Sequence, residues 1–129
     1  IMDEWKKMGF RPDGVYTGFL GDARQVDVIL KFVDTFCTET THILVDPVMG
    51  DQGKVYKTYS EELCEKMRIL VQHATVITPN ITEALLLLYG EEKMKKQKLK
   101  QSKQRTSALS FALQLKGKIL QNCMRTFLH

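Results

Sequence analysis

Two short segments of the sequence hold the side chains best suited to chemistry. The first, from Asp46 to Asp51, reads Asp-Pro-Val-Met-Gly-Asp, and the second, from Thr78 to Glu83, reads Thr-Pro-Asn-Ile-Thr-Glu. Carboxylate oxygens such as those of Asp46, Asp51 and Glu83 are ligands that Mg²⁺ accepts together with water and phosphate oxygens. The two segments therefore predict a site for magnesium and a polyphosphate.

Each segment follows a short apolar run that we predict to be a β-strand, at residues 42–45 and 75–77. Apolar residues at helical spacing predict helices between the strands. The other predicted elements are a strand at 14–17 and helices at 3–8, 23–36, 61–71 and 82–89. This alternation predicts an α/β fold with a parallel sheet and right-handed crossovers. Ligands bind such sheets at the carboxyl ends of the strands, where both segments lie.

Local signals also predict where two helices begin and end. Thr58 followed by Glu61 fits a capping box, which predicts a helix start near Tyr59. Asn80 followed by Glu83 fits a second capping box, and Gly90 is well placed to end the helix that it opens. A capping role would explain Asn80 and Glu83 without any ligand, although the two roles are compatible.

The two segments together resemble those of pyridoxal/pyridoxamine kinases of the ribokinase-like superfamily, over residues 5–90. Gly50, Asp51 and the nearby Tyr56 agree with pyridoxal kinases, and residues 17–21 are similar to that family's Thr-Gly-Tyr-Leu-Gly segment. The resemblance implies a mostly parallel sheet with helices on both faces. Hydroxymethylpyrimidine kinases of thiamine synthesis share part of the pattern and are the alternative, but they usually continue with Val-Ala-Lys-Ser-Gly.

The resemblance implies phosphorylation of the 5′-hydroxymethyl group of pyridoxal, pyridoxamine or pyridoxine, with ATP as co-substrate. It places Asp51 and Glu83 at the Mg²⁺ site, and Asp46 and Thr78 at a site for a monovalent cation, K⁺ or Na⁺. The structural alternatives are that both aspartates belong only to turns and that Thr78 only ends a strand. Intact relatives are expected to be homodimers.

The nucleotide and the vitamer would take further residues of the same motifs. By resemblance, Asn80, Tyr56 and Thr78 lie beside ATP, and Gly18 and Phe19 lie beside the vitamer. Phe19 stands where the family commonly has Tyr, so no hydroxyl is available there. Tyr56 could instead be a packed loop aromatic, and Gly18 could serve only the strand-to-helix turn.

The family's catalytic Gly-Thr-Gly-Asp segment, whose Asp acts as the base, has no counterpart here, because no Gly-x-Gly-Asp occurs in the 129 residues. No catalytic residue is therefore assigned, and we expect the chain alone to lack significant kinase activity. It opens at Ile1, which we interpret as missing upstream sequence. A remnant that binds nucleotide without turnover is the non-enzyme alternative.

The composition changes at Glu92. All 15 acidic residues precede Lys93, whereas ten of the 19 Lys and Arg residues lie at or after it. We interpret residues 1–92 as a partial kinase domain and 93–129 as a basic tail, either an aberrant reading frame or an amphipathic helix that touches lipid or a partner. The tail shows no motif for specific nucleic-acid recognition.

The sequence excludes several other classes of protein. It contains no apolar run of membrane-spanning length and no signal-peptide pattern, so we expect a cytoplasmic protein with no membrane partner. The three cysteines, Cys37, Cys64 and Cys123, form no CxxC pair, which favours structural thiols over a disulfide framework or a zinc site.

Overall fold

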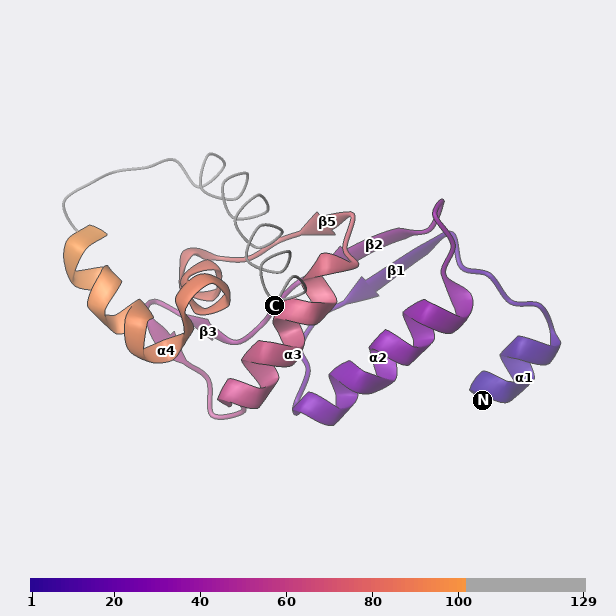
Figure 1. Cartoon of the computed structure of the whole chain (residues 1–129), viewed down its shortest axis with the longest axis horizontal. Coiled ribbons are helices and arrows are strands. Elements are labelled where there is room, and N and C mark those ends of the chain that lie inside the picture. Colours follow the sequence, from indigo (N-terminus) through magenta and orange to yellow (C-terminus); the bar gives the residue numbers. More distant parts are fainter. Residues whose placement is uncertain (102–129) are drawn as a thin grey trace, which may run out of the picture.

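The computed structural model of the chain describes residues 1–101, and only the backbone of residues 97–101. Helices and strands alternate along most of this part (Figure 1). The helices are α1 (Met2–Lys7), α2 (Ala23–Phe36), α3 (Glu61–Gln72) and α4 (Ile81–Gln101). The strands are β1 (Gly14–Thr17), β2 (His42–Val45), β3 (Gly50–Asp51), β4 (Lys54–Val55) and β5 (Val76–Ile77).

A three-stranded parallel sheet in the order β1-β2-β5 organises the described residues. Thr17 pairs with Val45, and Val45 pairs with Ile77, so all three strands end level with one another. The segments that follow β2 and β5 therefore leave the sheet from the same edge. This arrangement confirms the α/β fold with a parallel sheet that the sequence pattern predicts.

Helices α2 and α3 lie side by side along one face of the sheet (Figure 1). Alternate strand residues point toward them, and Ile43 and Val45 are buried there. The opposite face carries Tyr16 and Val76, which remain 68% and 51% exposed. Within residues 1–101, no helix combines the length and hydropathy that a membrane span requires.

The start of α3 differs from the capping box predicted at Thr58. Ser60 is the N-cap, and its Oγ accepts a hydrogen bond from the backbone N–H of Leu63 at 3.0 Å. The prediction was wrong because Thr58 and Ser60 are both good capping residues two positions apart, and the chain turns at Tyr59 before the helix begins.

Helix α4 begins after Asn80 and contains a break at Gly90, as the sequence predicts. Gly90 adopts φ 75° and ψ 175°, a conformation outside the helical region that costs glycine little. The chain resumes a helix after the break and passes position 92 without another interruption, and Met94 is fully buried in the core. Residues 102–129 of the proposed tail lie outside the described residues.

Candidate functional site

A tight β-hairpin, formed by β3 and β4, follows β2 at the carboxyl edge of the sheet. Its two turn residues, Gln52 and Gly53, have φ values of 49° and 75°, which identifies a type I′ turn. Gly50 pairs with Val55 so closely that a Cβ on Gly50 would overlap the carbonyl oxygen of Lys54 and lie 3.1 Å from the Val55 Cα. A glycine is therefore required at position 50.

The N-terminal turn of α4 holds this hairpin through two side chains. Asn80 Nδ2 donates to the carbonyl oxygen of Gly50 at 2.9 Å. Thr82 Oγ1 accepts from the backbone N–H of Gly53 at 2.8 Å. The hairpin thus lies against the positive end of the helix dipole, where anions such as phosphate are favoured.

Glu83 joins the same turn to the segment that precedes the hairpin. Its carboxylate accepts from the backbone N–H of Met49 at 3.2 Å and of Asn80 at 2.9 Å, while its own N–H donates to Asn80 Oδ1 at 2.9 Å. The reciprocal pair confirms the predicted capping box. Burial raises the pKa of Glu83, the hydrogen bonds oppose this, and the charge of Asp46 raises it further.

Asp46 is the first residue after β2 and is partly exposed. Its backbone N–H donates to the carbonyl oxygen of Thr17 at 2.9 Å, which fixes its position between β1 and β2. Its carboxylate lies near enough to Glu83 for the two negative charges to repel. A bound cation would relieve that repulsion.

Mg²⁺ fits this pair of carboxylates, because it is commonly held by one or two carboxylates together with water and phosphate oxygens. Among the described residues, no three acidic, histidine or cysteine side chains gather into a preformed metal-binding group. Asp51 lies on the exposed side of the hairpin, where its Oδ1 accepts from the N–H of Gln52 at 2.7 Å.

The remaining candidate residues lie along the same edge. Thr78 is exposed directly after β5, and its N–H donates to the carbonyl oxygen of Val45 at 3.2 Å. Tyr56 follows β4 and is 42% exposed. Gly18 and Phe19 follow β1, and Phe19 is 59% exposed. Because β2 lies between β1 and β5, Asp46 lies between the predicted vitamer residues and Thr78.

Two residues of this region lie within the motifs of the sequence analysis but were given no role there. Thr82 is buried and contacts Gly53, 29 positions away, so no local pattern reveals it. Thr17 ends β1, and within the described part of the chain its Oγ1 is buried without a hydrogen-bond partner. The Asp-Gln-Gly sequence at positions 51–53, with its glycine, was the available signal for the hairpin turn.

Comparison with known proteins places this geometry among kinases. A family model described as phosphomethylpyrimidine kinase matches residues 6–126. The pyridoxal kinase of Arabidopsis thaliana is 37% identical over 73 residues, covering 54% of this chain and 23% of the relative. A further relative is a Bacteroides thetaiotaomicron protein, assigned as a phosphomethylpyrimidine kinase and crystallised with pyridoxal. It is 41% identical with a TM-score of 0.63, and the match covers 67% of this chain and 30% of the relative's chain.

The pyridoxal kinase of Leishmania donovani, solved with ADP and pyridoxamine, is 25% identical with a TM-score of 0.63, over 93% of this chain and 38% of that chain. These structures confirm the ribokinase-like α/β fold expected from the two motifs. The chain spans less than two fifths of the length of each of these three relatives.

Proposed function

The chain belongs to the phosphomethylpyrimidine kinase family, and we propose that it forms the nucleotide- and magnesium-binding part of a kinase that phosphorylates vitamin B6 vitamers. The acceptor would be the 5′-hydroxymethyl group of pyridoxal, pyridoxamine or pyridoxine, and the donor would be ATP. The observation that carries the proposal is the contact of α4's N-terminal turn with the β3–β4 hairpin at the carboxyl edge of the sheet, next to Asp46.

Each side chain has a distinct role in this proposal. Asp46 and Glu83 would hold Mg²⁺. This pair replaces the Asp51–Glu83 pair that the resemblance implies, because Asp51 lies on the exposed side of the hairpin. Asp46 and Thr78 would hold the monovalent cation. Magnesium, when bound, would neutralise the charge that develops on the transferred phosphate. Asn80 holds the hairpin at its present distance from the helix and would contact the nucleotide together with Tyr56.

The acceptor side of the site would lie at the end of β1. The exposed ring of Phe19 offers an apolar face on which a flat pyridine ring can stack, and Gly18 beside it leaves room for the ligand. In this proposal the acceptor and the nucleotide would lie on opposite sides of Asp46, since β2 lies between β1 and β5. Transfer itself needs a base, which this sequence does not provide, so binding without turnover is the expected behaviour of the 129 residues.

Hydroxymethylpyrimidine kinase is the second candidate, because the matching family model carries the related description. The two candidates differ in the acceptor ring and share the nucleotide site. Titration of pyridoxal and of hydroxymethylpyrimidine against the chain separates them, since the vitamin B6 proposal requires tighter binding of pyridoxal.

Calorimetric titration of ADP, with and without Mg²⁺, tests the nucleotide site. Asp46→Asn should weaken Mg-ADP binding by about tenfold or more, because a contact to a charged group is worth about 1.5–3 kcal/mol, and should change metal-free ADP binding much less. Asp34→Asn, which removes an exposed carboxylate from α2, is the matched control. Equal affinities for wild type and Asp46→Asn, or no ADP binding by the folded chain, would contradict the proposal.

A further inference from the structure

The break in α4 leaves an unusual pair of backbone groups. In a continuous helix the N–H of Glu91 would donate to the carbonyl oxygen of Leu87, four residues earlier. Gly90 turns the chain out of the helical conformation between them. The last carbonyls of the first part of α4 and the first N–H of the second part therefore need other partners.

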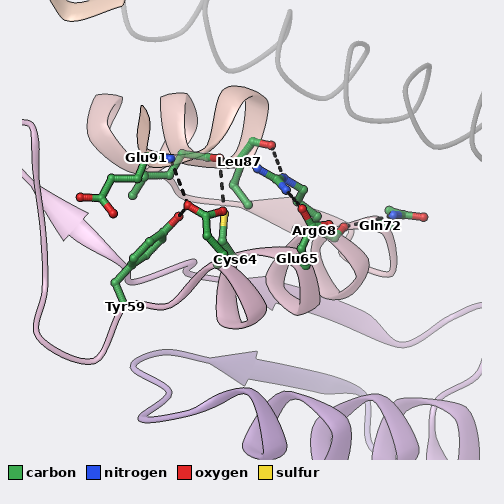
Figure 2. A network of polar contacts seen from close by, with 9 residues as sticks. Tyr59, Cys64, Glu65, Arg68, Gln72, Leu87 and Glu91 are labelled. Carbon is green, nitrogen blue, oxygen red and sulfur yellow. Dashed lines mark hydrogen bonds and ion pairs between the residues drawn. The ribbon is translucent and has the colours of Figure 1, made fainter. Parts of the chain in front are cut away.

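Side chains of α3 supply those partners (Figure 2). Arg68 donates from Nε to the Leu87 carbonyl oxygen at 2.7 Å and from Nη2 to the Leu86 carbonyl oxygen at 2.9 Å. Glu61 Oε1 accepts from the Glu91 N–H at 3.5 Å. Both members of the missing Leu87–Glu91 hydrogen bond are thus bound by α3, each by a side chain of the appropriate charge.

The spacing of these two residues on α3 suits the break. Glu61 and Arg68 are seven positions apart, which is about two helical turns, so they project from one face of α3. Gly90 lies between them, because a Cβ there would be 3.5 Å from Glu61 Oε2 and 3.7 Å from Arg68 Nη2. The cation lies at the C-terminal end of one helical segment and the anion at the N-terminal end of the next, as both helix dipoles favour.

Neighbouring residues hold the two side chains in place. The Tyr59 hydroxyl donates to Glu61 Oε1 at 2.8 Å, and Glu65 forms an ion pair with Arg68 (Figure 2). Burial and the hydrogen bond to Glu61 raise the pKa of Tyr59, so this hydroxyl keeps its proton and remains a donor. The Arg68 side chain is only 22% exposed, which limits competition from water.

We propose that Arg68, with Glu61, is a positioning residue for the nucleotide end of α4, an inference that rests on the proposed function. Arg68 binds the carbonyl oxygen of Leu87. In an α-helix the N–H of Leu87 donates to the carbonyl oxygen of Glu83, four residues earlier, so the two residues belong to the same turn. The segment 81–89 is short, and its two ends are held by the capping box and by Arg68. Loss of Arg68 frees the far end, so the segment tilts and Glu83 moves relative to the Met49 N–H.

Amide hydrogen exchange measured by NMR on the full 129-residue chain tests this proposal directly. Arg68→Met keeps the aliphatic stem and removes the donors. In Arg68→Met, exchange at the Met49 and Asn80 amides should be about tenfold faster relative to exchange at the Val33 amide of α2. The Val33 amide serves as the reference because it reports a loss of stability of the whole fold. Arg68→Lys should restore part of the protection. Lys66→Met, which removes a cation of α3 that pairs with Asp27, is the matched control and should leave these ratios unchanged.

Nucleotide affinity separates this proposal from the proposed function. Mg-ADP affinity should fall severalfold in Arg68→Met and stay at the wild-type value in Lys66→Met. Unchanged exchange ratios in folded Arg68→Met would overturn the positioning role, and Arg68→Lys decides the point if Arg68→Met does not fold. Faster exchange in Arg68→Met, together with no Mg-ADP binding by the wild type, would refute the proposed function and support the positioning of Glu83 by Arg68.

Discussion

Replacing Gly50 with alanine tests the geometry of the hairpin most sharply. The new Cβ would overlap the backbone carbonyl oxygen of Lys54 and lie 3.1 Å from the Val55 Cα. Both atoms are backbone of the paired strand, so no side chain can rotate away. Strands β3 and β4 must separate, and the hydrogen bond from Asn80 to the Gly50 carbonyl oxygen must stretch with them.

The cost follows from these contacts. Overpacking of this kind costs about 1–3 kcal/mol, and a weakened hydrogen bond adds up to about 1 kcal/mol. Alanine also restricts the unfolded chain, which returns about 0.4–1 kcal/mol. Taken together, these three terms lead us to expect that Gly50→Ala lowers the free energy of unfolding by about 1–3 kcal/mol.

Gly14 provides the matched control for this measurement. A Cβ at position 14 would meet only the His42 carbonyl oxygen, at an ordinary 3.6 Å. Gly14→Ala should leave the free energy of unfolding unchanged or raise it by up to about 1 kcal/mol. Urea unfolding of the two variants, followed by far-UV circular dichroism, gives the comparison. A Gly50→Ala variant as stable as Gly14→Ala would refute the close strand approach.

Three further predictions concern caps, protonation and the nucleotide. Ser60→Ala should cost about 1 kcal/mol of unfolding free energy, and Thr58→Ala much less, because only Ser60 caps α3; equal losses in urea would contradict this. The pKa of Glu83 is raised above its ordinary 4.5, so the free energy of unfolding should fall as the pH rises from about 4.5 toward the raised value. Urea unfolding from about pH 4 to 7 measures this, and the free energy should depend less on pH in Glu83→Gln. Asn80→Ala should weaken ADP binding more than pyridoxal binding in titrations; equal losses would indicate misfolding instead.

The sequence allowed the sheet and the second capping box to be predicted because both have local signals. Apolar runs of strand length precede the two motifs, and the paired residues Asn80 and Glu83 are three positions apart, within one helical turn. The break at Gly90 was also predictable, since glycine at the end of an apolar periodic segment is a common stop signal.

The sequence did not reveal contacts between distant positions. The hydrogen bond between Glu83 and Met49 joins residues 34 positions apart, and Arg68 reaches carbonyls 18 and 19 positions away. Such contacts depend on how two elements pack, and neither element alone encodes them. Ser60 illustrates another limit, because Thr58 and Ser60 are both good capping residues and only the path of the chain decides between them.

The most direct test of the central claim is a map of backbone amide chemical shifts as ADP and Mg²⁺ are added to the chain. Our account predicts that the largest changes occur at the N-terminal turn of α4, in residues 80–83, and in the hairpin at 49–55, with a smaller change at Asp46, and that they require Mg²⁺ for full size. Changes concentrated elsewhere on the molecule, or none at millimolar ADP, would contradict the assignment of this edge of the sheet as the nucleotide site.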